Sequence, residues 1–216
     1  MTTASLHDAK ESRDESTRTR GRPRCEDTRR RILQAAAEVL QEHGLAGATT
    51  DEVAERAGAS KATLYRWWPT KASLMVEALR DAVGQEKPFP HTGDFEHDLR
   101  KQLRNFAALV NGPRGRVFRA FVSAAQTDPE VKEAFLSGWV EPRRAEAKAV
   151  LERYRLAGIV PAAVDFDLLL DAMYGPFYFR LLLGHVRISA GYADAIADTV
   201  LHGLQHTQPK LACEAS

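Results

Sequence analysis

Two very short helices in the first third of the chain limit its fold more than any other feature. The stretches at 49–57 and 60–67 carry apolar residues at helical spacing. Each covers only about eight residues, and isolated helices shorter than ~12 residues are marginal in water. Between them, Ala57, Gly58 and Ala59 form a connection without side-chain bulk. The two helices must therefore be held by longer helices before and after them.

The flanking sequence supplies such helices. Residues 27–44 carry apolar side chains at a helical period, with Asp27 or Thr28 as a polar cap at the start and Gly44 at the end. A further amphipathic stretch begins after Thr70 and continues to about residue 83. Both are long enough to hold the short helices against them.

Capping residues define the short helices themselves. Thr49 and Glu52 have the spacing of a capping box, although Thr50 is an equally good cap. Ser60 is expected to cap the second helix, and Pro69 ends it because proline cannot continue the hydrogen-bond ladder. The sequence therefore predicts four helices with short connections between residues 27 and 83.

The second short helix is suited to contact with DNA. Two short helices joined by a tight turn form a helix-turn-helix, whose second helix enters the major groove. Leu64 and one of Trp67 and Trp68 would pack inward, and the small Ala62 would let the backbone approach. The side chains that can donate hydrogen bonds to DNA are Lys61, Thr63, Tyr65 and Arg66, with Lys71 placed to reach a phosphate.

Several of these residues also have an ordinary structural interpretation. Tyr65, Trp67 and Trp68 could be core aromatics, because the large area of an aromatic ring usually serves packing. Lys61 and Lys71 could be solvated surface charges. The helix pair by itself does not decide between these roles.

The run "TRRRILQAAAEVLQEHGLAGATTDEVAERAGASKATLYRWWPTKASLMVEAL" resembles the N-terminal DNA-binding domain of TetR-type transcriptional repressors. The matching motifs are "ILQAAAEVLQEHG", "TTDEVAERAG", "SKATLY" and the lysine of "PTK", and "RWWPTK" is similar to one branch of that family. The resemblance implies that Thr50 contacts the DNA backbone, that Lys71 binds a phosphate and that Ser60 to Trp67 enter the major groove. The recognition contacts carry over to Lys61, Thr63, Tyr65 and Arg66. Ala62 stands where the family often has glycine or proline, which leaves the base contacts of this helix open.

The segment before the first predicted helix is strongly basic in a chain whose net charge is only +1. Residues 1–24 lack periodicity and are predicted to be a disordered arm. Between Arg18 and Arg31 there are seven arginines and two acids, with Arg29–Arg31 expected in the first helical turn. "GRPR" resembles the core of a minor-groove AT-hook. The predicted DNA contacts of the arm are Arg20, Arg22 and Arg24, and the alternative is a solubilising tail.

After a break at 84–94 that is rich in proline and glycine, the sequence again indicates only helices. They are expected near 95–110, 115–127, 129–156, 165–183 and 192–206, and Pro142 should kink or split the third. The predicted fold is all-α, because no strand-like alternation persists. It comprises an N-terminal helix-turn-helix three-helix domain and a larger C-terminal helical domain, which the resemblance assigns to dimerisation and ligand binding. The expected boundaries are 25–83 for the first domain with its connecting helix, 84–208 for the second and 209–216 for a disordered tail.

The last two predicted helices are suited to a dimer interface. The segment 165–183 is apolar almost all round, so it must be buried on nearly every side, and Gly175 would permit close helix approach. The segment 192–206 carries one apolar stripe. Two copies of these helices are predicted to form a four-helix interface, with a purely intramolecular core as the alternative. The residues assigned to this interface are Phe177, Leu181, Ile196, Val200 and Leu204.

The same domain is rich in aromatic residues, which suggests an apolar ligand pocket between helices. The residues predicted to line it are Phe106, Phe121, Trp139, Tyr174 and Tyr178. An ordinary aromatic core is the alternative, because such rings are usually buried for packing. No cluster of charges points to one class of ligand, so only a small apolar or amphipathic molecule is expected.

No motif indicates catalysis, a cofactor or a membrane span. The GxSxG, P-loop, GxGxxG and HExxH patterns are absent. His202 and His206 are four residues apart, but no nearby cysteine or carboxylate completes a metal site, so none is expected. The N-terminus has no apolar leader, and charges interrupt the longest apolar stretch. The expectation is a cytoplasmic protein that is not an enzyme and has no cofactor.

These features together predict a homodimeric, ligand-responsive transcriptional regulator, in the first instance a repressor. It would bind a palindromic double-stranded DNA operator with half-sites one helical turn, or a multiple of it, apart. A small-molecule inducer would release it. Two other classes stay open: an architectural DNA-binding protein with little sequence preference, and an all-helical enzyme.

Overall fold

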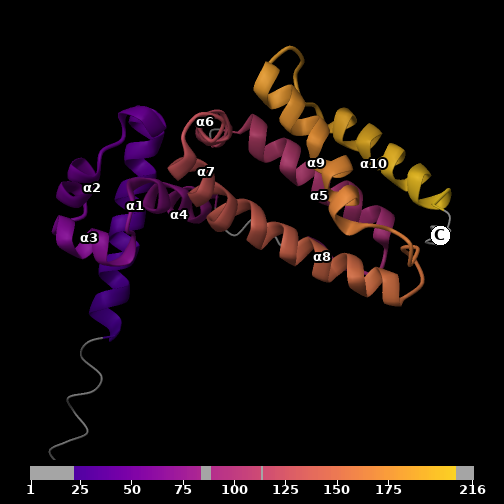
Figure 1. The fold of residues 1–216 in the computed structure, drawn as a ribbon, viewed down its shortest axis with the longest axis horizontal. Helices are drawn as coiled ribbons and strands as arrows, with labels where there is room; N and C mark the ends of the chain where they lie inside the picture. Colours follow the sequence, from indigo (N-terminus) through magenta and orange to yellow (C-terminus); the bar gives the residue numbers. More distant parts are fainter. Residues whose placement is uncertain (1–21, 84–88, 113, 208–216) are drawn as a thin grey trace, which may run out of the picture.

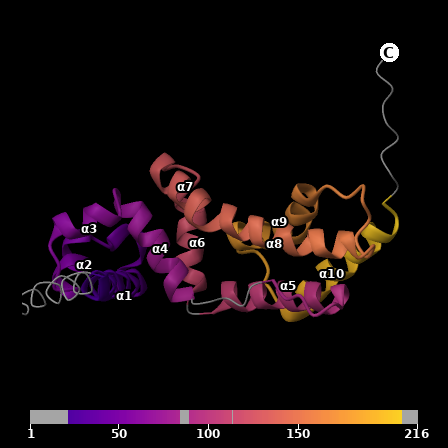
Figure 2. The same ribbon diagram turned by 90° about the horizontal axis from the view of Figure 1, so that it is seen from below.

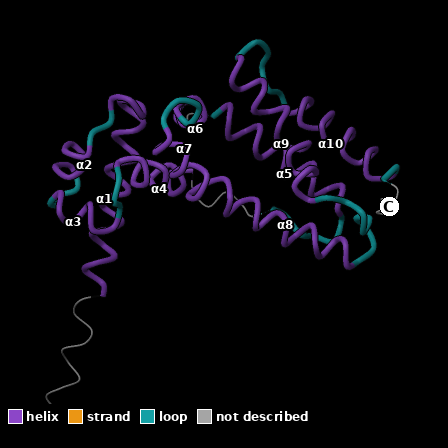
Figure 3. Tube along the Cα trace, viewed as in Figure 1, coloured by secondary structure: helices purple, strands orange, loops and turns teal. Residues whose placement is uncertain are grey.

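The computed structural model describes residues 22–83, 89–112 and 114–207, and every regular element within them is helical (Figure 3). The elements in chain order are α1 Arg22–Gly47, α2 Thr50–Arg56, α3 Lys61–Trp67, α4 Lys71–Val83, α5 Phe95–Asn111, α6 Gly115–Ala124, α7 Pro129–Phe135, the π-helical turn η1 Leu136–Val140, α8 Glu141–Leu156, α9 Phe166–Leu183 and α10 Ala190–Gln205. The predicted all-α fold with an N-terminal helix-turn-helix is thereby confirmed. No helix in these ranges has the length and apolarity needed to cross a membrane.

The molecule is elongated, with the helix-turn-helix at one end and the last two helices at the other. Figures 1 and 2 show α1, α2 and α3 at one end and α9 and α10 at the other. Helices α4, α6 and α7 lie between them, while α5 and α8 extend towards the far end. A change in the C-terminal helices can therefore reach α3 only through the middle of the molecule.

Helix α1 begins earlier than predicted. Its first residue is Arg22, not Asp27 or Thr28, so the expectation that residues 22–24 belong to a disordered arm is wrong. Pro23 is tolerated there because its missing N–H would have no intrahelical partner in the first turn. Consequently Arg29–Arg31 lie about two turns inside the helix, not in its first turn. At the other end, Gly44 interrupts the helix with a left-handed backbone (φ 67°), as its predicted role as a helix end requires.

The predicted caps of the next helices are confirmed. Thr49 Oγ1 accepts a hydrogen bond from the Glu52 amide at 3.2 Å, and Ser60 Oγ accepts one from the Thr63 amide at 3.1 Å. Thr70 Oγ1 likewise accepts from the Ser73 amide at 3.0 Å. Short polar side chains thus define where α2, α3 and α4 begin.

The predicted helix at 129–156 is split, as Pro142 suggested. The chain forms α7, widens into η1 and continues as α8, with Pro142 in the first turn of α8. Proline has no N–H to donate to the carbonyl four residues earlier, so a regular α-helix cannot continue unchanged through this point. Within η1, Gly138 lies against α4: a Cβ atom at this position would be 2.7 Å from Val76 Cγ1.

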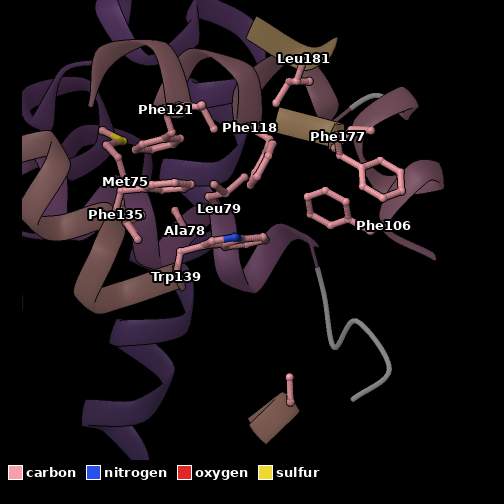
Figure 4. Close-up of a cluster of buried hydrophobic side chains, with 14 of the residues drawn as sticks. Met75, Ala78, Leu79, Phe106, Phe118, Phe121, Phe135, Trp139, Phe177 and Leu181 are labelled. Atoms are coloured by element: carbon pink, nitrogen blue, oxygen red, sulfur yellow. The ribbon is translucent and has the colours of Figure 1, made fainter. Parts of the chain in front are cut away.

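One continuous core joins the two ends of the chain. Met75, Ala78 and Leu79 of α4 lie among aromatic rings from the C-terminal helices, as Figure 4 shows. The labelled rings in that cluster are Phe106, Phe118, Phe121, Phe135, Trp139 and Phe177. The predicted break falls partly on residues 84–88, which lie outside the described ranges, but Phe89 directly after them is buried in the same core. Helix α4 therefore belongs structurally to both regions.

Candidate nucleic-acid interface and regulatory core

Helix α3 has one buried face and one exposed polar face. Leu64 is fully buried, and Trp68, which follows the last helical residue, is 2% exposed. The predicted DNA-contacting residues Lys61, Tyr65 and Arg66 are exposed, as is Ala62, whereas Thr63 is half-buried. The core interpretation is therefore wrong for Tyr65, which is 44% exposed, and right for Trp68.

The turn between α2 and α3 fixes the angle of that exposed face. Gly58 has a φ of 57°, in the left-handed region that glycine adopts at little cost. Across the turn, Thr50 Oγ1 and the Tyr65 hydroxyl share a hydrogen bond of 3.2 Å. The structure thus brings together two residues that the sequence placed on different helices and assigned to DNA contact.

Lys61 has a partner that sequence reasoning missed. Its ammonium group forms an ion pair with the carboxylate of Asp51 on α2, and both side chains are more than half exposed. The stretch from Ser60 to Lys71 itself contains no acid, so only the fold of the helix pair reveals this contact. Lys71 is half-buried at the first residue of α4.

Two aromatic residues end the recognition helix in different environments. Trp67 is half-buried, with the guanidinium carbon of Arg66 lying 5.3 Å from its ring centre. Trp68 meets Trp67 edge-on at 5.6 Å, and its Nε1 donates to Glu77 Oε2 on α4 at 2.5 Å. The exposed end of α3 is therefore followed directly by a buried residue, Trp68, which is bound to α4.

A cluster of charged side chains holds α2 on α1. Arg56 donates to both oxygens of Glu42, at 2.9 and 2.7 Å, and to Glu52 at 2.6 Å. The hydrogen bonds from Arg56 lower the pKa of Glu42 and raise the pKa of Arg56. Ligand atoms of Glu42, His43 and Glu52 lie within 4.8 Å of one another, a spacing that a metal ion can use. Arg56 already occupies both carboxylates, which disfavours a cation there.

The predicted arm contacts lie at the edge of the described residues. Arg22 and Arg24 belong to the first turn of α1, although their side chains are not described, and Arg20 lies outside the described ranges. Further along, Arg30 is exposed and pairs with Asp27 at 2.7 Å. The assignment of Arg20, Arg22 and Arg24 to DNA stays a prediction.

The five residues predicted to line a ligand pocket are brought together, but as packed core. Phe106, Phe121 and Trp139 are at most 7% exposed, whereas Tyr174 and Tyr178 are half-buried. The ring of Phe106 lies 5.1 Å from Tyr174 and 6.0 Å from Tyr178. Phe121 and Trp139 both stack on Phe135, at 6.0 and 6.3 Å. The core interpretation is therefore right for the three buried rings.

A buried amide beside these rings was not foreseen. Gln102 Nε2 donates to the Tyr174 hydroxyl at 3.0 Å, while Gln102 Oε1 is buried and has no hydrogen-bond partner. A buried acceptor without a partner costs free energy and calls for a water or ligand donor. In the sequence, this glutamine looks like an ordinary polar residue on a helix surface.

A second unforeseen group is the carboxylate of Asp98, which is fully buried. It accepts hydrogen bonds from the Tyr154 hydroxyl, from the Thr92 amide at 2.6 Å and from Thr92 Oγ1 at 2.9 Å. Burial raises the pKa of Asp98, but these hydrogen bonds outweigh it and the pKa lies below the ordinary value. Burial also raises the pKa of Tyr154, to about 12. The cluster ties α8 to the start of α5.

A groove of about 560 Å³ lies between α9 and α10, at the end far from α3. Ile196, Val200 and Leu204, which were assigned to the dimer interface, line it. Phe177 and Leu181 do not: they are at most 3% exposed, because they face the core within one chain, so their assignment to the interface is wrong. The large apolar residues that α9 does expose are Leu168, Phe179, Leu182 and Leu183.

Comparison with known proteins identifies both parts of the chain. Residues 32–78 match the family described as bacterial regulatory proteins, tetR family, and residues 89–200 match the tetracyclin repressor-like C-terminal domain. The HTH-type transcriptional regulator YdeS of Bacillus subtilis, itself uncharacterised, is 33% identical over 188 residues, which are 87% of this chain and 95% of that protein. AqdR of Rhodococcus erythropolis, also an HTH-type transcriptional regulator, is 28% identical over 68% of this chain and 70% of its own length.

Solved structures show the same relationship. The TetR family transcription regulator SCO0332 superposes with a TM-score of 0.74 at 35% identity, covering 82% of this chain and 98% of that one. Bacillus subtilis FadR, solved in complex with stearoyl-CoA, has the same fold, with a TM-score of 0.60 at 14% identity. That alignment covers 81% of this chain and 98% of FadR.

Proposed function

Because this chain belongs to the TetR family of bacterial transcriptional regulators, we propose that it is a homodimeric repressor that reads a palindromic operator through α3 and is released by a small molecule. The observation that carries the DNA-binding part is the division of α3. Leu64 and Trp68 anchor one face, while Lys61, Tyr65 and Arg66 stand exposed on the other. A short helix held in this way can enter a major groove without deforming.

The phosphate contacts are proposed to flank this helix. Thr50, at the first residue of α2, and Lys71, at the first residue of α4, lie on either side of α3 in the chain. Ser60 and Thr63 complete the start of the recognition helix, where their hydroxyls lie 2.9 Å apart. Contacts with phosphates position a protein on DNA, whereas contacts of Lys61, Tyr65 and Arg66 with base edges would give sequence preference.

The dimer is proposed to form through α9 and α10. Along α9, Leu168, Ala172, Gly175, Phe179 and Leu182 are all exposed and follow each other at alternating spacings of four and three residues. This is the repeat with which two helices pack along a common seam. A Cβ atom at Gly175 would meet nothing within 4 Å in the single chain. We propose that a second copy of α9 and α10 covers this seam and the adjoining groove.

The inducer is proposed to bind beside Tyr174 and Tyr178, where α9 faces α5. The buried Oε1 of Gln102 lacks a donor, and the half-buried tyrosines border the aromatic core. A ligand that satisfies this site has an apolar, ring-bearing body and one hydrogen-bond donor. Its binding would loosen or shift the packing of Phe106, which touches both tyrosine rings.

The decisive experiment is selection of genomic DNA fragments by the purified protein, followed by binding measurements on the selected sequence and on a shuffled control. A repressor predicts a palindrome and a preference of about 10³ or more over the shuffled DNA. A preference near unity would contradict the proposal and favour an architectural DNA-binding protein. The genes beside the selected sites would indicate which compounds to test for release.

The site of the inducer can be tested separately with Gln102→Leu. This variant removes the acceptor that has no partner together with the hydrogen bond to the Tyr174 hydroxyl. The two losses offset each other in the stability of the free protein, and DNA binding should stay intact. Compounds that carry a donor should lose their ability to release DNA. If every active compound still releases DNA from the variant, the ligand does not bind at Gln102.

A further inference from the structure

The carboxylate of Glu77 connects the three helices that surround the DNA-reading surface. It lies on α4 and accepts a hydrogen bond from Trp68 Nε1, at the end of α3, at 2.5 Å. It also forms an ion pair with Arg29 of α1. The guanidinium carbon of Arg29 in turn lies 5.8 Å from the centre of the Trp68 ring. The three side chains therefore form a closed set of contacts between α1, α3 and α4.

Burial makes this set more than a surface ion pair. Trp68 is 2% exposed and the side chain of Glu77 is 21% exposed, whereas the side chain of Arg29 is 46% exposed. A buried indole N–H needs an acceptor, and the Glu77 carboxylate supplies it. An ionised acceptor also makes the hydrogen bond stronger than a neutral one. The orientation of the Trp68 ring is thus set by Glu77.

We propose that Glu77 is a positioning residue for sequence-specific DNA binding: it fixes the end of the recognition helix through Trp68 and holds Arg29, in the basic start of α1, to the same point on α4. Trp68 follows the last residue of α3, and its amide donates to the Leu64 carbonyl at 3.0 Å. A shift of the Trp68 backbone would therefore move the end of the helix that carries Tyr65 and Arg66. The inference rests on the proposed sequence-specific DNA binding and names the residue that holds the reading helix in register.

Glu77 also lies next to the aromatic cluster of Figure 4. The preceding residue, Val76, is the one that Gly138 of η1 packs against. Met75 and Leu79 on the same helix are buried in the aromatic cluster (Figure 4). A displacement of α4 by that cluster would carry the Glu77 carboxylate with it, because a helix moves as a rigid body over one turn. Trp68 and Arg29 would then move together, because both are bound to the Glu77 carboxylate.

The test compares the binding constants for a selected genomic DNA fragment and for a shuffled fragment of the same composition. Glu77→Ala and Trp68→Phe should each lower their ratio by about tenfold or more, because a buried partner is lost. Glu77→Gln should lower it by less than about threefold, since its side-chain oxygen still accepts from Trp68. Asp81→Asn is the matched control: it removes the same charge from an exposed position one turn further along α4, and its ratio should equal that of the wild type.

A double variant distinguishes positioning from general destabilisation. If Glu77 acts through Trp68, Glu77→Ala combined with Trp68→Phe should lose no more of the ratio than either change alone. Measurements well below the melting temperature of each variant keep the folded fraction constant, so loss of stability by itself would leave the ratio unchanged. The inference is overturned if Glu77→Ala leaves the ratio unchanged, or if Asp81→Asn or Glu77→Gln lowers it as much as Glu77→Ala does. It is also overturned if the double variant loses the full sum of the two single losses. If the wild type itself does not discriminate between the fragments, the proposed function fails instead.

Discussion

At the scale of single residues, Lys61 is the clearest case of a role altered by its surroundings. Its ammonium group is paired with Asp51 in the free protein. Contact of Lys61 with DNA requires that this pair opens. Because both side chains are largely exposed, the pair itself stabilises the fold little. The pair should instead lower the affinity for DNA, because Asp51 competes with DNA for Lys61 and its carboxylate repels the phosphates.

Replacement of Asp51 by asparagine should therefore tighten DNA binding. We expect the affinity for selected and shuffled DNA to rise together, and its dependence on salt to steepen by about one counterion. Fluorescence anisotropy at several salt concentrations measures both quantities. Glu55→Gln, an equal loss of charge at an exposed position on α2, is the control and should change the affinity less. An affinity that falls in Asp51→Asn would show that the carboxylate helps to hold Lys61 for DNA.

Asp98 should make the stability of the fold depend on pH. Its carboxylate is fully buried and its pKa lies below the ordinary value of 3.8. The stabilisation is complete above that ordinary value, where both the folded and the unfolded protein carry the charge. It is lost as the pH falls through the lower pKa of the folded state, because the unfolded chain takes up the proton first.

Asp98→Asn should therefore lower the free energy of unfolding at pH 7 by about 2 kcal/mol, the cost of charge-assisted hydrogen bonds lost in the interior. The gap between wild type and variant should stay constant down to about pH 5 and narrow towards pH 3. Urea denaturation at these pH values measures it. Asp81→Asn, an exposed change, provides the baseline. A gap that is the same at pH 3 as at pH 7 would contradict a depressed pKa.

At the scale of elements, η1 and α4 depend on each other. Pro142 prevents a regular helix from continuing through this region, and the resulting π-helical turn brings Gly138 onto Val76. A helix pair can approach this closely only where one side chain is absent. The contact therefore explains a glycine at a place where alanine would otherwise favour the helix.

Gly138→Ala should destabilise the protein by about 1–2 kcal/mol, because the new methyl group would lie too close to Val76 Cγ1. Val76→Ala leaves a cavity and should cost about 1 kcal/mol by itself. The double variant should be more stable than the sum of these losses, since the methyl group then occupies the space that valine vacated. Thermal melts of the four proteins give the coupling energy. Simple additivity would mean that η1 moves away from α4 without cost.

At the scale of the whole molecule, the two ends differ in what they leave exposed. The α3 end presents polar side chains, whereas the α9–α10 end presents apolar ones, including Leu168 at 70% and Phe179 at 59% exposure. An uncovered apolar seam of this length is unusual for a monomer and marks an interaction surface. The arrangement fits a dimer joined at one end that reads DNA with the other.

Phe179→Glu should convert the proposed dimer to a monomer at micromolar concentration, because a charge would have to be buried in the seam. Sedimentation equilibrium measures the change. The helix content of the monomer should be preserved, since this side chain is exposed in the single chain. Leu156→Glu, an exposed change outside α9 and α10, should leave the oligomeric state unaltered. A wild-type monomer under the same conditions would refute the dimer itself.

Short-range sequence patterns predict most of the helix ends and the buried face of α3. Ser60, Thr70 and Gly44 mark helix ends because a capping hydroxyl or a left-handed glycine acts within a few residues of its position. The apolar period likewise predicted that Leu64 faces inward. The start of α1 was misplaced, since Pro23 is compatible both with a disordered arm and with a first helical turn.

Contacts between distant parts of the chain fix which side chains share a site. The period of α9 could not tell a core face from an interface face, because both are apolar, and so Phe177 and Leu181 were assigned to the wrong side. In the same way, Asp98, Gln102 and Glu77 look like ordinary polar residues on amphipathic helices. Burial by partners that lie far away in the chain makes each of them significant. Short-range patterns therefore suffice for most helices, for the family and for the DNA-reading helix, because they act within a few residues. Long-range packing fixes where the carboxylates and the exposed apolar seam lie.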